Sequence, residues 1–237
     1  MSNVQGEKPA FLLAGGRNTD TSMIVRLLGR SLLNCKTAAY IGAANGDSEA
    51  FFELTKSLLQ KLGLKRIEFV KTATEKADTG KAIETLYDAD VIYISGGEVE
   101  DGMKWLKKHS LCEIIRDIYN KGKQFICVSA GTIMMGTHWI SVDETDDYDK
   151  AELFDCLKII PAVFDTHAED EDWIELKTTL KLLGDGSTGY GIRTGGILSA
   201  SIDGRLVSVN KELLEIKFTD KGFLVKEIKE RRAESYG

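Results

Sequence analysis

One serine in this chain stands where a nucleophile would be exposed at the end of a sheet. An apolar run, 125–128, leads into Ser129, and two small residues, Ala130 and Gly131, follow it. Such a strand-to-helix turn, a nucleophile elbow, admits only small side chains beside the serine and holds its Oγ clear of the backbone. Cys127 replaces the first glycine of the usual Gly-x-Ser-x-Gly pattern. The segment therefore predicts either a catalytic serine or a buried strand that ends in a serine helix cap.

A serine nucleophile needs a base, and the chain has three histidines, His109, His138 and His167. His109 follows two lysines at the expected end of a helix, which favours an exposed position. His138 comes soon after the elbow, where packing or surface exposure is the simpler interpretation. His167 ends an apolar run, at the point where a strand would release its last side chain toward a site. We predict that His167 is the general base, with a structural histidine as the alternative.

A glycine turn after another expected strand could supply hydrogen-bond donors for an oxyanion. Gly96 and Gly97 follow the apolar run 91–95. A backbone without Cβ atoms allows an N–H group to approach a substrate carbonyl closely. The residue after the serine, Ala130, would offer a second N–H group. A pair of glycines alone is usually only a turn, so the prediction depends on this turn converging with Ser129.

Strand-like runs alternate with amphipathic segments in the first half of the chain, which predicts an α/β fold. The expected strands are 10–14, 37–41, 66–70, 91–95 and 124–128. The expected helices are 21–33, 47–62, 76–87 and 102–121. In the second of these helices, apolar residues recur at helical spacing and should form one stripe against a sheet. These residues are Phe51, Leu54, Leu58, Leu59 and Leu62.

From about residue 187 the sequence becomes rich in glycine and in short strand-like runs. The expected strands are 189–192, 197–201, 206–209 and 216–218, with a hairpin turn at Asp203 and Gly204. We expect them to be antiparallel and to pack on the edge of the sheet. The predicted fold is a three-layer, mostly parallel sheet flanked by helices, with extra antiparallel C-terminal strands, in a single domain over 1–237.

Composition narrows the classes of function. The net charge is −6 and no Lys/Arg face stands out, so we expect no nucleic-acid partner. No apolar run approaches the roughly 18 residues that cross a bilayer, and the first residues lack the pattern of a secretory signal. We therefore expect a cytoplasmic protein with no membrane partner. The scattered cysteines predict neither a zinc site nor a redox pair. They are Cys35, Cys112, Cys127 and Cys156.

Four motifs in order resemble the peptidase E and cyanophycinase family of serine peptidases, which have a fold like that of the class I glutamine amidotransferases. The motifs are 94–97, 128–131, 165–167 and 189–192. The resemblance runs from about Ala10 to Leu206. It implies hydrolysis of a peptide or isopeptide bond in a short substrate by a serine and a histidine completed by a carboxylate, without a metal or an organic cofactor. It also implies a dipeptidase or a related exopeptidase.

The resemblance assigns roles to particular residues. Ser129 would attack the carbonyl, His167 would take its proton, and the N–H groups of Gly97 and Ala130 would hold the oxyanion. An acidic residue of the family falls near Glu144 here. Glu144 is therefore the expected third catalytic member, with the neighbouring Asp143 and Asp146 as alternatives and a solvated acidic loop as another interpretation.

The chain departs from the family pattern just after the histidine. The family commonly has aromatic and arginine residues there, whereas this chain has four consecutive carboxylates, 169–172. These would repel an aspartate side chain and favour a cationic group, such as a free N-terminus or a Lys or Arg side chain. The acidic runs 143–149 and 169–172 could wall the site or be solvated loops. The expected substrate-binding residues are Gly96, Glu98, Glu169 and Asp170.

Other functions remain open at this point. The scaffold could belong to a non-catalytic binding or regulatory protein, because a fold alone does not confer activity. The same serine and histidine could also serve an amidase or an esterase. A cysteine-dependent amidotransferase is disfavoured because Ser129, and not Cys127, occupies the exposed position of the elbow. A homodimer formed through an exposed apolar helix would be unsurprising.

Overall fold

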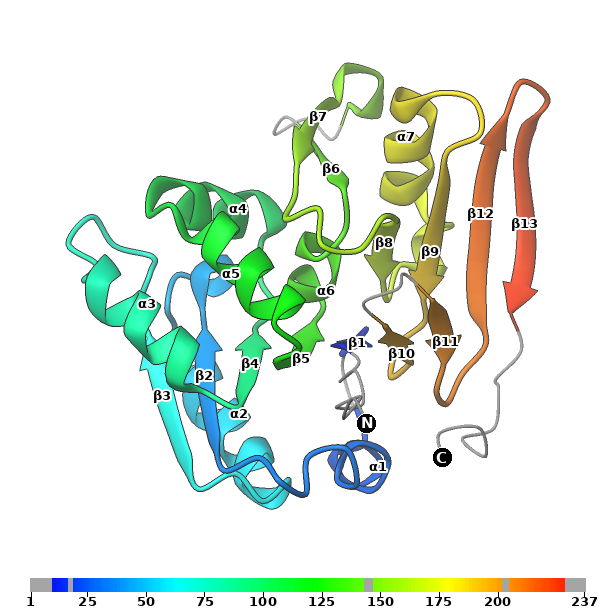
Figure 1. Ribbon diagram of the computed structural model, residues 1–237. Helices are drawn as coiled ribbons and strands as arrows, with labels where there is room; N and C mark the ends of the chain where they lie inside the picture. The colour runs from blue at the N-terminus through cyan, green and yellow to red at the C-terminus, as the bar shows by residue number, and fades with distance from the viewer. Residues whose placement is uncertain (1–9, 17–18, 143–146, 202–204, 229–237) are drawn as a thin grey trace, which may run out of the picture.

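A seven-stranded sheet forms the centre of the computed structural model, which describes residues 10–16, 19–142, 147–201 and 205–228 (Figure 1). Its order is β11-β10-β1-β5-β4-β2-β3. The five strands from β1 to β3 in this order run parallel, and β10 and β11 are antiparallel to their neighbours. The strands are β1 (Ala10–Leu13), β2 (Thr37–Ile41), β3 (Arg66–Val70), β4 (Val91–Ile94), β5 (Gln124–Val128), β10 (Ile197–Ala200) and β11 (Leu206–Ser208). The expected α/β fold class is confirmed.

Helices cover both faces of this sheet because successive residues of its strands point to opposite faces. In β1, Leu12 joins an apolar cluster with residues of α3 to α6, whereas Phe11 and Leu13 join a second cluster with residues of α1 and α2. The helices are α1 (Thr21–Leu28), α2 (Glu49–Lys61), α3 (Thr79–Asp88), α4 (Val99–Lys108), α5 (Leu111–Asn120) and α6 (Ala130–Met134). A short 3-10 helix, η1 (Ala43–Asn45), follows β2.

A second sheet lies beside the first, in the order β13-β12-β9-β8 (Figure 1). It consists of β8 (Val163–Thr166), β9 (Thr188–Ile192), β12 (Leu213–Thr219) and β13 (Gly222–Ile228), with α7 (Ile174–Leu183) packed against it. The expectation that the C-terminal strands are antiparallel and pack on the edge of the main sheet is confirmed for β10 and β11, but β9 and β12 belong to the second sheet. Gly189 and Gly191 bring β9 so close to α7 that a Cβ atom would lie 2.6 Å from Leu176 and 2.8 Å from Trp173.

Two expected helices also differ from the structure. The segment 102–121 divides into α4 and α5 because Ser110 adopts a left-handed φ of 55°. In α2 the buried face includes Phe52, whose ring packs against Tyr40, while Phe51 is 50% and Leu54 75% exposed. The apolar stripe expected on α2 is therefore partly wrong, because aromatic packing at β2 sets the rotation of the helix.

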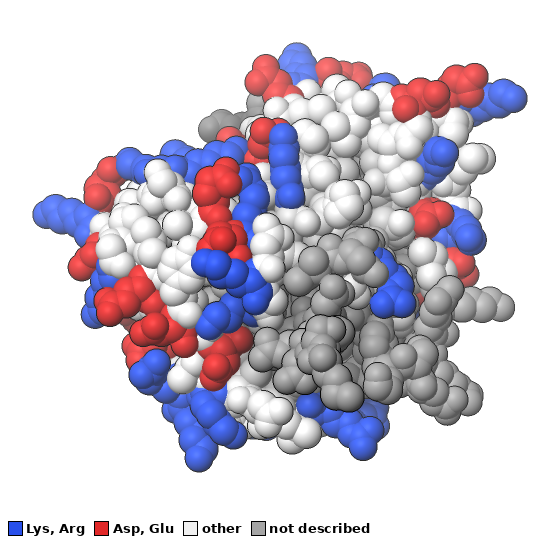
Figure 2. Space-filling model, viewed as in Figure 1, with Lys and Arg blue, Asp and Glu red and all other residues white. Residues whose placement is uncertain are grey.

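A small antiparallel pair, β6 (His138–Ser141) and β7 (Glu152–Asp155), follows α6. Figure 2 shows Lys and Arg interspersed with Asp and Glu over one face of the molecule. Within the described ranges, no helix has the length and apolar character needed to cross a membrane.

Candidate active site

Ser129 occupies a sharp turn between β5 and α6. Its φ and ψ are 52° and −120°, a conformation that few residues with a side chain adopt. Its N–H donates to the carbonyl oxygen of Leu13 at 2.9 Å, and the Oγ1 of Thr132 donates to the carbonyls of Leu13 and Cys127. A Cβ atom on Gly131 would lie 2.3 Å from the carbonyl oxygen of Ile94. The turn is thus fixed against the ends of β1 and β4, as a nucleophile elbow requires.

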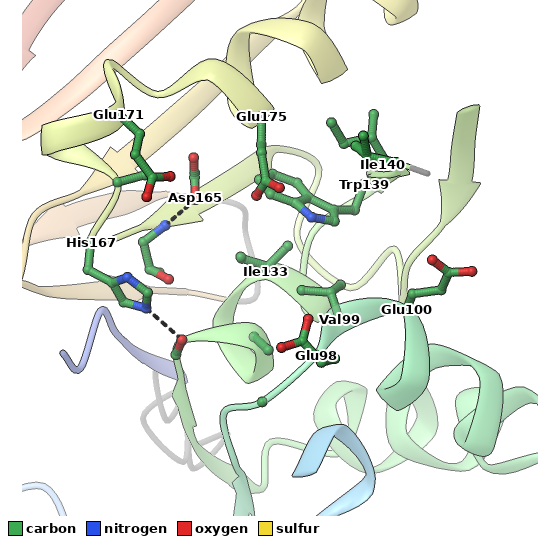
Figure 3. A pocket seen from close by; sticks show the side chains of 16 residues that line it. Glu98, Val99, Glu100, Ile133, Trp139, Ile140, Asp165, His167, Glu171 and Glu175 are labelled. Carbon is green, nitrogen blue, oxygen red and sulfur yellow. Dashed lines mark hydrogen bonds between the residues drawn. The ribbon is translucent and has the colours of Figure 1, made fainter. Parts of the chain in front are cut away.

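His167 follows β8 directly and faces the serine from the second sheet. Its Nε2 lies 2.8 Å from the Oγ of Ser129 (Figure 3). The backbone of His167 has a φ of 49°, and its N–H donates to the carbonyl oxygen of Ile192 in β9 at 2.9 Å. The structure therefore brings together the two residues that the sequence analysis paired, each at the end of a strand in a different sheet.

The glycine turn after β4 lies against η1. Gly97 has a φ of 141°, and a Cβ atom there would lie only 2.0 Å from the carbonyl oxygen of Ala44. The Nδ2 of Asn45 donates to the Oγ of Ser95 and to the carbonyl of Gly96, which holds the turn. Gly97 lines the same pocket as Ser129 and Ala130. Ala130 is the first residue of α6, a position whose N–H has no acceptor within a helix.

The pocket beside Ser129 has a volume of about 340 Å³ and is bordered by carboxylates and apolar side chains (Figure 3). The carboxylates belong to Glu98, Glu100, Asp165, Glu171 and Glu175. The apolar residues include Val99, Ile133, Trp139 and Ile140. None of the described residues that line it is a lysine or an arginine. The charge of the wall is therefore strongly negative.

Asp165 is the most buried of these carboxylates, at 2% exposed. Burial and the charges of Glu175 and Glu171 raise the pKa of Asp165 to about 7. The N–H groups of Thr166 and Leu176 lower this pKa, but by less than burial raises it. Its Oδ1 accepts from the N–H of Thr166 at 2.7 Å. Within the described chain, Asp165 Oδ2 and Thr166 Oγ1 are buried without a hydrogen-bond partner. Buried polar atoms of this kind are rare unless a ligand or water completes them.

The other predicted site residues are placed differently. Glu98 lines the pocket, but Glu169 and Asp170 do not. The Oε1 of Glu169 accepts from the N–H of Thr194 at 3.0 Å, and Asp170 is exposed. Burial raises the pKa of Glu169, but its own N–H, Thr194 and the charge of His167 outweigh burial and lower it overall. Glu144, Asp143 and Asp146 lie outside the described residues.

The remaining histidines lie away from this pocket. His109 is half-buried rather than exposed, because its ring stacks on Trp105 and its Nε2 lies 3.0 Å from the carbonyl oxygen of Thr74. The Nε2 of His138 lies 3.2 Å from Asp155, as expected for a packing role. Cys127 is fully buried, and burial raises the pKa of its thiol, which removes it as a nucleophile.

Fold and site define an α/β protein with a serine at a strand-to-helix elbow and a histidine within hydrogen-bond distance. The sequence matches Peptidase family S51 over residues 10–205, and the chain belongs to this family. It is 32% identical over 135 residues to the uncharacterized peptidase Lin0382 of Listeria innocua, a match that covers 55% of this chain and 63% of that protein. The match thus spans less than two thirds of the relative.

Two solved structures share the fold. A peptidase from an acI-B1 actinobacterium superposes with a TM-score of 0.70 at 21% identity, covering 94% of each chain. A protein assigned as a peptidase E from Listeria monocytogenes EGD-e gives a TM-score of 0.57 at 20% identity, covering 94% of this chain and all of that one. The resemblance to the peptidase E family noted in the sequence is therefore confirmed.

Several residues at the site were not predicted from the sequence. Asn45 could have been found, because it follows β2, whose carboxyl end meets the same sheet edge as Ser129. Glu175 and Trp139 carry no comparable signal. They reach the pocket from α7 and β6, whose positions depend on packing between distant parts of the chain.

Proposed function

We propose that this protein is a serine peptidase in which Ser129 is the nucleophile and His167 the general base. The observation that carries this proposal is the 2.8 Å distance between Ser129 Oγ and His167 Nε2 at the elbow. A base at this distance can take the hydroxyl proton as Oγ attacks a carbonyl carbon. Family membership supports a peptidase, and the pocket beside the pair provides room for a short substrate.

The proposed reaction proceeds in two steps. Oγ forms a bond to the carbonyl carbon, His167 holds the released proton, and the N–H groups of Gly97 and Ala130 stabilise the oxyanion. As the carbon–nitrogen bond breaks, His167 gives the proton to the leaving amine. Water then attacks the acyl-enzyme, with His167 again acting as base, and frees Ser129 and the carboxylic acid product.

A carboxylate near His167 would stabilise the imidazolium that forms in each step. We propose that Glu169 is the carboxylate that stabilises the imidazolium of His167. It is the described carboxylate whose pKa is lowered by His167, and its Oε1 is fixed by Thr194. Glu144 remains the alternative suggested by the family resemblance. If Glu169 has this role, Glu169→Gln should reduce kcat far more than Glu144→Gln, and the reverse order would assign the role to Glu144.

Labelling with a fluorophosphonate tests the nucleophile and the base. We expect the wild type to gain one adduct on Ser129, located by mass spectrometry, and Ser129→Ala and His167→Ala to gain none. His109→Ala is the matched control, since His109 lies outside the pocket, and it should label at the wild-type rate. A folded wild type that resists labelling would favour a non-catalytic binding protein on this scaffold.

Labelling alone does not separate a peptidase from an amidase or an esterase. We propose a dipeptidase or another exopeptidase, because a pocket of about 340 Å³ accommodates one or two residues rather than a long segment. Hydrolysis of di-, tri- and hexapeptides, each free or acetylated at the N-terminus, would test this. Faster cleavage of long acetylated peptides than of free dipeptides would contradict it.

A further inference from the structure

The carboxylates of the pocket form two groups on opposite sides of an apolar floor. Asp165, Glu171 and Glu175 lie on one side, and Glu98 and Glu100 lie on the other (Figure 3). Glu100 already accepts a hydrogen bond from Ser141 at 2.6 Å. In the first group, Asp165 belongs to β8, which His167 follows directly, Glu171 lies between β8 and α7, and Glu175 is in the first turn of α7.

Asp165 is the buried member of the first group, at 2% exposed. Asp165 and Thr166 are among the residues that line the pocket, and Asp165 Oδ2 and Thr166 Oγ1 are buried with no hydrogen-bond partner within the described residues. Glu171 and Glu175 carry their charges close enough to raise the pKa of Asp165. Such a cluster is electrostatically unfavourable when empty, and a cation placed among its members would relieve the repulsion.

The apolar floor indicates what kind of cation fits. Ile133 and Val99 lie between the two groups of carboxylates, and the ring of Trp139 borders the same space (Figure 3). These three side chains are 4% to 8% exposed. A metal ion would make no use of this floor, and among the described residues no group of acidic, histidine or cysteine side chains has the arrangement to hold one. A methylene stem with a charged end would use both the floor and the acids.

We propose that Asp165, Glu171 and Glu175 form a subsite for the cationic end of a lysine or arginine side chain on the acyl side of the scissile bond. This inference rests on the proposed function of Ser129 and His167. The methylene groups of the side chain would pack on Ile133 and Val99, and its ammonium or guanidinium would donate to Asp165 Oδ2. Specificity would then come from Asp165, Glu171 and Glu175, and not from the exposed Asp170.

Covalent labelling by a matched pair of aminoalkyl diphenyl phosphonates tests the subsite. One probe carries a lysine side chain and the other the uncharged norleucine side chain, and both have an acetylated α-amine. Ser129 Oγ forms a bond to phosphorus, phenoxide leaves, and His167 receives the serine proton. The rate constants are measured by intact mass, and their lysine-to-norleucine ratio cancels effects on Ser129 and His167 themselves.

We expect the lysine probe to react about tenfold or more faster in the wild type, as one charge-assisted contact allows. Glu171→Gln and Glu175→Gln should each lower this ratio severalfold, and Asp165→Asn should bring it near one. Glu171 is exposed and Glu175 is half-buried, so these variants test the proposal even if Asp165→Asn folds poorly. Glu212→Gln makes the same chemical change at an exposed position outside the pocket and should keep the wild-type ratio.

The outcomes separate the subsite from the chemistry. If both probes label Ser129 at equal rates, the subsite is wrong and the serine peptidase proposal stands. If neither probe nor a fluorophosphonate labels Ser129, the proposed function fails and the subsite with it. A preference for the lysine probe that survives in all three variants would overturn the assignment to these residues. If versions of both probes with a free α-amine label Ser129 faster than the acetylated ones by the same factor, and the lysine-to-norleucine ratio stays near one, the N-terminus rather than a side chain occupies the subsite.

The dependence of this ratio on pH gives a second readout. Asp165 has a pKa near 7, so it is more often ionised at pH 8 than at pH 6. The ratio should therefore rise with pH in the wild type and stay flat in Asp165→Asn. Glu171, Glu175, Glu98 and Glu100 face the same space and His167 adjoins it. If the lysine-to-norleucine ratio still rises with pH in Asp165→Asn, the rise comes from one of these other groups, which would contradict the role of Asp165.

Discussion

Ser129 and His167 share a backbone property that separates them from most residues with side chains. Their φ angles are 52° and 49°, in the left-handed region that costs free energy for a residue with a Cβ atom. Each is held there by a hydrogen bond from its own N–H to a neighbouring strand, at Leu13 and Ile192 respectively. Strained backbone at the two residues that we propose to react is typical of sites whose surroundings fix them before substrate arrives.

Asp165 should make stability depend on pH in an unusual direction. Its pKa is about 7 in the folded protein and about 3.9 in an unfolded chain. Between these values the folded state keeps a proton that the unfolded chain loses, so the free energy of unfolding falls as pH rises. Asp165→Asn removes this term. We expect the free energy of unfolding of the variant, relative to that of the wild type, to rise by a few kcal/mol, an order-of-magnitude figure, between about pH 3.5 and about pH 8.

Urea unfolding of both proteins across this pH range checks the prediction. What matters is the difference between the two curves, because other carboxylates contribute equally to both. A difference that stays constant, or that shrinks as pH rises, would show that Asp165 is ionised in the folded protein without cost.

Gly97 should tolerate no side chain. Gly97→Ala would combine a φ of 141° with a Cβ atom 2.0 Å from the carbonyl oxygen of Ala44. We expect a loss of roughly 2–4 kcal/mol in the free energy of unfolding and a large fall in the labelling rate of Ser129. Gly122→Ala is the matched control, since its φ is 77° and its Cβ would meet nothing within 4 Å. Equal losses in the two variants would contradict the packing argument.

At the scale of elements, η1 supports the site without touching substrate in our proposal. Asn45 donates from Nδ2 to Tyr40, Ser95 and Gly96, and these contacts connect the ends of β2 and β4. We expect Asn45→Ala to cost about 1–3 kcal/mol in stability and to slow labelling of Ser129, because the turn that carries Gly97 would lose its anchor.

Ser48→Ala is the control for Asn45→Ala. Ser48 lies in the same connection, but its hydroxyl accepts from the N–H of Phe51 at the start of α2 rather than from the glycine turn. The Ser48→Ala variant should be less stable than the wild type, without a matching loss in the labelling rate of Ser129. If the two variants lose labelling in proportion to stability alone, the positioning role of Asn45 is wrong.

The strands near Ser129 and the short C-terminal strands could be predicted from the sequence, but the second sheet that β9 and β12 join could not. The strands 37–41, 66–70 and 124–128 have the predicted bounds, because apolar runs and helical periodicity are local signals. The Ser129 and His167 pairing followed from residue chemistry and order. The second sheet depends on contacts between α7 and the glycines of β9, which no local pattern records. Glu175 therefore could not be placed in the pocket beforehand.

At the scale of the whole molecule, the segment between β9 and β10 is one of the connections that link the two sheets. This segment forms backbone hydrogen bonds with Ala14 and Gly15, which follow β1. Asn210 also holds it, because its side-chain amide donates to the carbonyl of Gly195 and accepts from the N–H of Ile197. We expect Asn210→Ala to lower the free energy of unfolding by about 1–3 kcal/mol. Ser129 labelling should then disappear at a lower urea concentration than the helical circular dichroism signal.

Simultaneous loss of labelling and of helical signal in Asn210→Ala would show that the two sheets unfold as one unit. Glu212→Gln changes an exposed side chain two residues away and should leave both transitions as in the wild type. The comparison therefore measures how firmly the second sheet holds His167 against Ser129.

Ser129 and His167 lie at the ends of strands in two different sheets, which has a consequence for synthesis in the cell. During synthesis, Ser129 leaves the ribosome before His167. The backbone of His167 is held by β9, which pairs with β8 on one side and with β12 on the other, so His167 is fixed only after these later strands have formed. Until those late strands arrive, the serine has no base beside it. If the pair acts as proposed, the nascent chain is latent, and hydrolytic capacity is among the last properties that the folding polypeptide acquires.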